Sequence, residues 1–211
     1  METLKKTCAH LFRCPNLMEG GKTVAEKVNL ANPAALGLGG FALTTFILNV
    51  VNAGIIPAES LGMVFPMGLF YGGLGQFVAG MWDIKRGDIF GGTCFSSFGA
   101  FWIGLASMIL LETAGVIPKV PPAGMAVFLI AWGIFTAYAT IGALRISWGV
   151  TTVFVTLTLL FFLLAAGEFN PLIKTIAGYE GIFCALTAWY CSAGILINTI
   201  YKREIVPLGE R

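Results

Sequence analysis

Long stretches without charged residues dominate the pattern of this chain. Six such stretches, mainly apolar, cover residues 28–58, 60–82, 89–111, 120–144, 146–167 and 181–201. Each is longer than the roughly 20 residues that a helix needs to cross about 30 Å of hydrocarbon. We therefore predict six transmembrane helices, at residues 34–53, 61–82, 90–111, 123–144, 147–166 and 181–201.

An all-α membrane protein is the fold class that this pattern favours. The apolar stretches are continuous, whereas strands of a membrane barrel alternate over about ten residues. Hydrophobic residues make up 57% of the chain and charged residues only 11%. We expect an N-terminal tail (1–31), a six-helix transmembrane domain (32–202) and a C-terminal tail (203–211). The short connections leave no room for a soluble catalytic domain.

The distribution of Lys and Arg predicts the orientation in the membrane. Eleven of them lie before the first span, in the second and fourth connections, or after the last span, and only Lys119 and Lys174 lie in the other connections. Positive residues favour the cytoplasmic side, so we expect a multi-pass protein of the plasma or inner membrane with both termini in the cytoplasm. The basic residues are dispersed, which gives no indication of nucleic-acid binding.

The cysteines indicate neither a disulfide framework nor a metal site. Their number, five, is odd, and three lie inside predicted spans. Cys8, His10 and Cys14 resemble metal ligands, but three groups without a fourth are more typical of a surface helix or a loose tail. We expect no metal and no cofactor.

A capped helix start marks the entry to the first span. Asn32 is a suitable N-cap and Pro33 a suitable first helical residue. The backbone N–H groups at such a start carry partial positive charge and attract anions. We therefore expect the mouth of the first span to hold an anion.

The predicted spans contain no ionisable residue at mid-depth. Glu112, Glu168 and Glu180 fall at the predicted external ends, and Asp83 and Asp88 fall in a cytoplasmic connection. Intramembrane ionisable residues are typical of proton relays. This pattern favours a substrate that carries its own proton or a small neutral solute. With no intramembrane general base or activated nucleophile, it also argues against an enzyme.

Neutral polar residues repeat at helical spacing in the first two spans. One set is Gly37, Phe41, Thr45 and Asn49, and the other is Gly68, Gly72, Gln76 and Gly80. Residues four apart share one face of a helix. The glycines would let a solute approach the amide of Gln76, which offers donors and an acceptor. Single Ser and Thr residues in the later spans are more typical of packing between membrane helices.

Several separated motifs resemble the acetate uptake transporter family, the succinate–acetate permeases. Residues 32–38 read Asn-Pro-Ala-Ala-Leu-Gly-Leu, which is similar to the family signature Asn-Pro-Ala-Pro-Leu-Gly-Leu. Residues 70–73 with Gln76, residues 93–102, residues 132–136 and residues 206–210 also fit the family. The resemblance covers about residues 29–210.

The resemblance implies a six-helix protomer, a homo-hexameric ring and transport of acetate, related monocarboxylates or succinate with protons. It also implies an apolar constriction formed by Phe41, Phe98 and Leu157. Two positions depart from the family pattern. Ala35 replaces the second proline of the signature, and Phe98 replaces a tyrosine, so the constriction lacks a hydroxyl group.

The leading hypothesis is therefore a transporter or channel-like permease for acetate, coupled to protons and embedded in membrane lipid. The candidate substrate-binding residues are Asn32, Gly37, Thr45, Asn49, Tyr71, Gln76, Ser97, Thr136 and Thr187. Two alternatives remain open at this point. One is a channel for a neutral solute such as urea, an amide or ammonia, and the other is a membrane scaffold or sensor that transports nothing.

Overall fold

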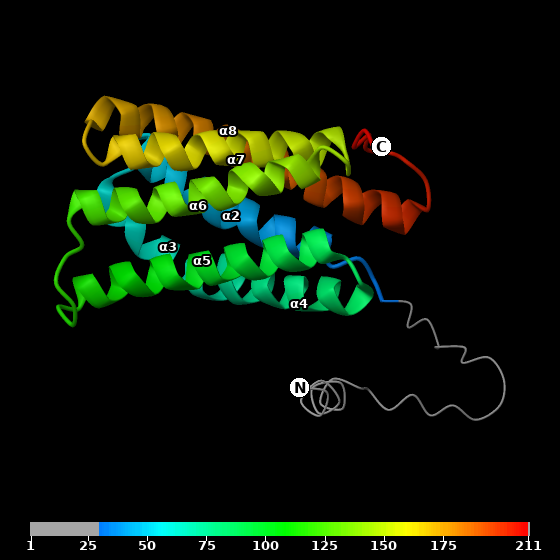
Figure 1. Ribbon diagram of the computed structural model, residues 1–211, viewed down its shortest axis with the longest axis horizontal. Coiled ribbons are helices and arrows are strands. Elements are labelled where there is room, and N and C mark those ends of the chain that lie inside the picture. Colours follow the sequence, from blue (N-terminus) through cyan, green and yellow to red (C-terminus); the bar gives the residue numbers. More distant parts are fainter. Residues whose placement is uncertain (1–29, 211) are drawn as a thin grey trace, which may run out of the picture.

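The computed structural model describes residues 30–210, and within this range the chain is a bundle of long helices (Figure 1). The elements are α2 (Ala34–Asn52), η1 (Ala58–Met63), α3 (Val64–Leu69), η2 (Phe70–Gly75), α4 (Gln76–Arg86), α5 (Ile89–Thr113), α6 (Pro122–Ala143), α7 (Trp148–Gly167) and α8 (Pro171–Tyr201). The segment from η1 to α4 forms one continuous span. The described residues thus contain six apolar helices long enough to cross a membrane, which confirms the predicted fold class.

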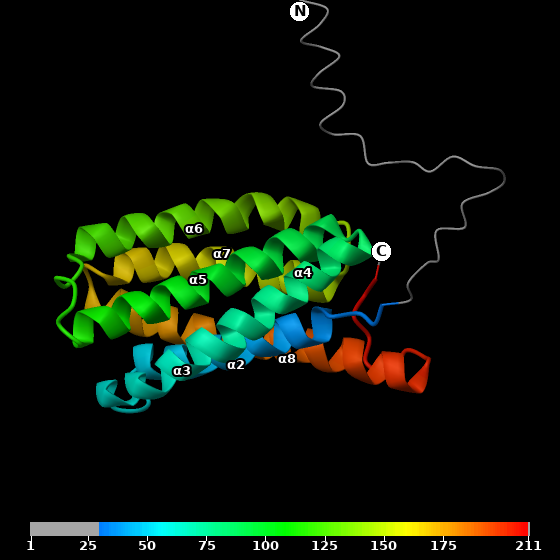
Figure 2. The ribbon, with the colours of Figure 1, turned by 90° about the horizontal axis from the view of Figure 1, so that it is seen from below.

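Successive spans alternate in direction along the bundle. The start of α2, the end of α4, the start of α5, the start of α7 and the C-terminal residues all lie at one end (Figures 1 and 2). We call this end the vestibule end. The predicted metal-like group of Cys8, His10 and Cys14 and most of the predicted N-terminal tail lie outside the described residues.

The second span is longer and less regular than we predicted. It includes a 3₁₀ segment (η1) and a π-helical turn (η2), and α4 continues to Arg86. The helix ends there because Gly87 adopts a left-handed conformation, with φ of 85°. Asp83 therefore lies in a helix, and its predicted place in a connection was wrong.

The last span also begins earlier than we predicted. Asn170 caps α8 by accepting the backbone N–H of Leu172, and Pro171 occupies the first helical position. Glu180 therefore lies about two and a half turns inside the helix rather than at its external end. The prediction failed because charged residues end an apolar stretch without ending a helix. Both carboxyl oxygens of Glu180 are buried, with no hydrogen-bond partner among the described residues.

The C-terminal residues fold back onto the bundle at the vestibule end. We call residues 205–210 the strap. Backbone N–H groups of Trp148 and Gly149 donate to the carbonyls of Gly209 and Leu208 at 2.9 and 3.0 Å. The side chain of Asn198 accepts the N–H groups of residues 205 and 206 and donates to the carbonyl of residue 206. These hydrogen bonds hold the strap against the start of α7 and the end of α8.

Candidate functional site

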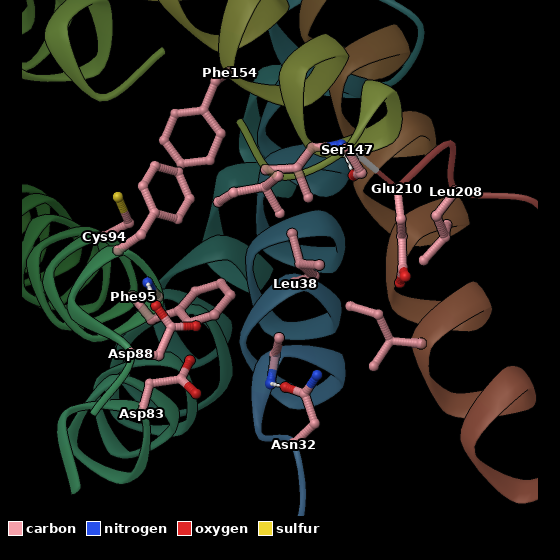
Figure 3. A pocket seen from close by; sticks show the side chains of 16 residues that line it. Asn32, Leu38, Asp83, Asp88, Cys94, Phe95, Ser147, Phe154, Leu208 and Glu210 are labelled. Carbon is pink, nitrogen blue, oxygen red and sulfur yellow. Dashed lines mark hydrogen bonds between the residues drawn. The ribbon is translucent and has the colours of Figure 1, made fainter. Parts of the chain in front are cut away.

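A cavity of about 250 Å³ opens at the vestibule end of the bundle (Figure 3). Its wall comes from the starts of α2, α5 and α7, the ends of α4 and α8, and the strap. Asn32, Asp83, Asp88, Ser147 and Glu210 supply its polar side chains. We call this cavity the vestibule. It joins segments that are far apart in the sequence, and each enters it through a helix end or the strap.

The start of α2 is capped much as the sequence predicts. The assigned helix begins at Ala34, but Pro33 already has helical dihedral angles and its carbonyl accepts the N–H of Gly37. The side-chain oxygen of Asn32 accepts the N–H of Ala34 at 3.0 Å and a hydrogen bond from Arg86, also at 3.0 Å. This oxygen is thus already engaged, and the guanidinium ties the end of α4 to the start of α2.

The charges of the vestibule differ from those of a simple anion site. Arg86 forms an ion pair with Asp83 at 2.9 Å, while Asp88 caps α5 by accepting the N–H of Gly91. With Glu210, the described lining carries three carboxyl groups. Asp83 is only 1% exposed, and its oxygen Oδ2 has no hydrogen-bond partner among residues 30–210. An anion in the vestibule is therefore repelled by these carboxyl groups, although the start of α2 attracts it.

A second, much smaller cavity lies next to the vestibule. It has a volume of about 20 Å³ and shares Leu38, Cys94, Phe95 and Phe154 with the vestibule wall. Its other lining residues are Phe41, Gln76, Phe98, Val153 and Leu157. We call it the inner void. Its size suffices for about one water molecule, so the pathway is closed at this level.

The structure brings the predicted constriction residues together around the inner void. Phe41, Phe98 and Leu157 are all buried, and the ring centroids of Phe41 and Phe98 lie 6.2 Å apart. The ring of Phe98 also stacks on the ring of Phe161, with an interplanar angle of 13°. It packs edge-on against Phe135, with 5.3 Å between the two ring centroids. Phe98 is therefore held by rings on several sides.

Gln76 supplies the polar group of the inner void. Its side chain is 1% exposed, and its oxygen Oε1 has no hydrogen-bond partner in the described part of the chain. A buried amide oxygen without a partner costs about 1–3 kcal/mol relative to a bonded one. Such a group is stabilised when a hydrogen-bond donor comes within reach of it.

Thr45 and Asn49 lie further along α2 and outside both cavities. The amide of Asn49 donates to the carbonyl of Thr45 at 2.9 Å and accepts from Asn52 at 3.2 Å. Gly181 of α8 packs directly against this amide. The hydroxyl of Thr45 is buried and lacks a hydrogen-bond partner among the described residues. Both residues share the face of Phe41, but α8 covers this face at the level of Asn49.

The other predicted binding residues also lie outside both cavities; these are Gly37, Tyr71, Ser97, Thr136 and Thr187. Thr136 and Thr187 donate their hydroxyls to carbonyls of their own helices. Gly37 packs against the ring of Phe95. Thr187 lines an open groove formed by α7, α8 and the strap. The binding roles of these residues stay predictions.

The sequence reasoning missed the residues that shape the vestibule. The sequence pattern places Asp83 and Asp88 in a connection and Glu210 in the C-terminal tail. A signal for Asp83 existed, because Lys85 and Arg86 followed by Gly87 form the typical end of a helix and place Asp83 in its last turn. For Glu210 no comparable signal exists, because its position depends on the contacts of the strap. Within residues 30–210, no group of three or more His, Cys, Asp or Glu side chains could hold a metal ion.

Comparisons with known proteins agree with this architecture. A sequence profile of the GPR1/FUN34/yaaH family matches residues 16–205. The succinate-acetate/proton symporter SatP of Escherichia coli K12 is 39% identical over 183 residues, which are 86% of this chain and 96% of that protein. Acetate permease A of Emericella nidulans is 34% identical over 202 residues, covering 88% of this chain and 68% of that protein.

A solved structure has the same fold. The structure of the bacterial acetate channel SatP matches with a TM-score of 0.82 and 38% sequence identity, and the match covers 85% of this chain and 99% of that chain. The family match spans every helix of the described residues.

Proposed function

We propose that this chain, which belongs to the GPR1/FUN34/yaaH family, is a transporter that moves acetate and related small carboxylates across the cell membrane together with protons. Similar proteins carry names that refer to acetate or to succinate with protons. The observation that carries the proposal is the succession of two cavities. A polar vestibule leads to a closed, mainly apolar void lined by Gln76, whose amide oxygen has no hydrogen-bond partner within residues 30–210.

The inner void acts as the selective step. Phe41, Phe98 and Leu157 form part of its wall, and a constriction whose wall is mostly apolar excludes hydrated ions because a single amide cannot replace their water. A bare acetate ion would pay the same desolvation cost. The carboxyl group therefore crosses the void as the neutral acid or with a proton beside it.

Gln76 is the residue that we propose to bind the carboxyl group in the void. Its free oxygen Oε1 accepts a hydrogen bond from a protonated carboxyl group. The hydroxyl of Thr45 lies one turn beyond Phe41 on α2 and has no partner within the described part of the chain, and it then supports the group on the far side. The remaining candidate residues act through packing in this scheme.

The assembly and orientation that we propose follow the sequence pattern. Both ends of the described chain lie at the vestibule end, which we assign to the cytoplasmic side because Lys and Arg concentrate there. We further propose a homo-hexamer in which each protomer has its own pathway. We also propose a transporter rather than an enzyme, because similar proteins are named as a symporter, a permease and a channel.

Uptake of labelled acetate into proteoliposomes tests the proposal. Protein-free liposomes of the same lipid are measured in parallel, because acetic acid also crosses bare bilayers. We expect protein-dependent uptake that rises with an inward proton gradient and falls when unlabelled acetate is added. An excess of urea or ammonium should leave it unchanged. Uptake that ignores the proton gradient would refute the coupling, and unchanged permeability would indicate a scaffold.

A further inference from the structure

Leu208 of the strap lies between the vestibule and the open groove. The groove has a volume of about 560 Å³, and Leu208 is the one described residue that lines both cavities (Figure 3). Along α7, Gly149 lines the groove and the next residue, Val150, lines the vestibule. Along the strap, Gly209 lines the groove and Glu210 lines the vestibule. The two cavities therefore lie on opposite sides of the layer that α7 and the strap form.

The side chain of Leu208 fills the seam between the strap and α8. The hydroxyl of Tyr190 donates to the carbonyl of Pro207 at 2.7 Å, and the side chain of Asn198 bonds the backbone of the strap. Gly194 lies four positions from each of these α8 residues and therefore on the same helix face. A methyl group at Gly194 would lie 2.5 Å from Cδ2 of Leu208. Leu208 is thus seated on a glycine, and it is only 7% exposed.

We propose that Leu208 is a specificity-determining residue, whose side chain prevents the alkyl chain of a longer carboxylate from extending out of the vestibule into the groove. This inference rests on the proposed transport of small carboxylates. Two backbone hydrogen bonds already close the seam between the strap and α7. The seam between the strap and α8 is closed by Leu208, so the vestibule ends at this side chain.

The groove would bind an alkyl chain if the seam were open. Its lining includes Trp148, Phe183 and Leu186, and each of them is more than half exposed on the outside of the bundle. Each methylene group that moves from water onto such apolar surface raises affinity about fourfold at most. Acetate has a single methyl group and gains nothing from this opening. The seal therefore discriminates by chain length, whereas the carboxyl group is the same in every competitor.

The seal and the inner void act at different steps. The inner void limits which solutes cross the protein, because its volume is only about 20 Å³. Leu208 instead limits which carboxylates bind in the vestibule and block it. A long-chain carboxylate that reached the groove would occupy the vestibule without crossing. The predicted consequence of an open seam is thus inhibition of acetate exchange rather than transport of the longer acid.

Truncation of Leu208 tests the inference. Leu208→Ala removes the atoms that pack on Gly194, while Leu208→Met keeps an apolar side chain of similar volume. Val206→Ala is the matched control, because Val206 is a partly buried strap residue that lines neither cavity. Chromatography in detergent verifies that each variant folds. If Leu208→Ala does not fold, Leu208→Val removes less of the side chain and is measured in its place.

The measurement is exchange of labelled acetate in buffered proteoliposomes without a pH gradient, in the presence of unlabelled acetate, butyrate, hexanoate or octanoate. These acids cross the bilayer and so reach the vestibule in either orientation of the protein. The leak of protein-free liposomes with the same acid is subtracted. Each inhibitory concentration is divided by that of unlabelled acetate for the same variant, which removes any general change in activity.

For Leu208→Ala, the relative inhibitory concentration of octanoate should fall on the order of tenfold below that of the unmodified protein, since about two methylene groups gain contact with the groove. For butyrate the change should stay within about twofold, because its chain is too short to reach the groove. Leu208→Met and Val206→Ala should behave as the unmodified protein does. Leu208→Val should shift octanoate in the same direction by a smaller factor.

Two results would overturn the inference while leaving the transport function intact. One is an unchanged relative inhibition by octanoate in folded Leu208→Ala, which would mean that the side chain does not separate the cavities. The other is an equal shift in Val206→Ala, which would assign the effect to a looser strap. If the unmodified protein exchanges no acetate at all, the proposed function itself fails, and this outcome is distinct from the other two.

Discussion

The two sides of helix α5 at residues 98 and 99 are packed in opposite ways. Phe98 faces the inner void and is surrounded by rings from α2, α6 and α7. Gly99 faces the second span, where a methyl group would lie 2.5 Å from the backbone nitrogen of Phe77 and 2.8 Å from the carbonyl oxygen of Gly73. On the side of Phe98 the contacts are therefore between aromatic rings, and on the side of Gly99 they are between backbone atoms of α5 and the second span.

This difference indicates where the pathway can change its width. Backbone atoms in contact through glycines cannot separate without moving whole helices. Side-chain rings can change from one rotamer to another while the helices stay in place. We therefore expect opening of the inner void to come from the aromatic side, with the glycine side as a fixed support. Substitutions on the two sides should consequently fail in different ways.

Loss of the ring at position 98 should have the largest effect. Phe98→Ala removes a buried ring in contact with Phe41, Phe154 and Phe161, and we expect a loss of about 3–5 kcal/mol in unfolding free energy. In the variant protein that still folds, the inner void becomes wider. The protein should then also take up solutes that are larger than acetate or carry a charge. Thermal unfolding in detergent and uptake into proteoliposomes measure the two effects.

Phe183→Ala is the control for that variant, because Phe183 is 53% exposed and lies outside the vestibule and the inner void. It should change neither stability nor selectivity appreciably. Unchanged selectivity in folded Phe98→Ala would show that the aromatic side does not set the width of the pathway.

A methyl group on the glycine side should reduce stability without widening the pathway. For Gly99→Ala we expect a loss of about 1–3 kcal/mol, because the clash is with backbone atoms that cannot move away. The matched control is Gly104→Ala in the same helix, where the added methyl group meets no atom within 4 Å. Unfolding in detergent should separate the two, while the residual uptake of Gly99→Ala keeps its selectivity. Equal stabilities would contradict the fixed-support role.

Removal of the amide in the inner void should affect transport and stability with opposite signs. Gln76→Leu replaces a buried oxygen that has no partner among residues 30–210, so we expect a gain of about 1 kcal/mol in stability. Acetate uptake should fall on the order of tenfold, because the carboxyl group loses its hydrogen bond. A parallel loss of stability and uptake would instead assign Gln76 a structural role.

The fold was predictable from the sequence because the charges divide it into spans. The number of spans among the described residues and their approximate positions agree with the prediction. The first and last residues of the helices were less predictable. In α8, Lys174 and Glu180 interrupt the apolar pattern but not the hydrogen bonds of the helix. The π-helical turn at residues 70–75 has no periodic signal that distinguishes it from an α-helix.

The site was predictable only in part. The resemblance of the motifs pointed to Phe41, Phe98 and Leu157, and the structure places all three around one void. Helical spacing places Asn49 on the same face as Phe41, but it cannot reveal that Gly181 covers this amide. Likewise, the acidic vestibule depends on the strap and on the end of α4, which meet only in three dimensions. Contacts between distant helices thus decide which polar residues face the pathway.

The smallest expected effect concerns the hydroxyl group that position 98 lacks. Phe98→Tyr keeps the ring and its contacts, so we expect a change in stability below about 1 kcal/mol. Phe98 and Gln76 line the same small void, and the added hydroxyl would offer a donor to the free oxygen of Gln76. That bond would compete with the substrate, and acetate uptake should fall about two- to threefold. A double-mutant cycle with Gln76→Leu measures the interaction, with an expected coupling of about 0.5–1 kcal/mol. A coupling of zero would mean that the hydroxyl does not reach Gln76, and the ring at position 98 would then control the width of the void without affecting its hydrogen bonding.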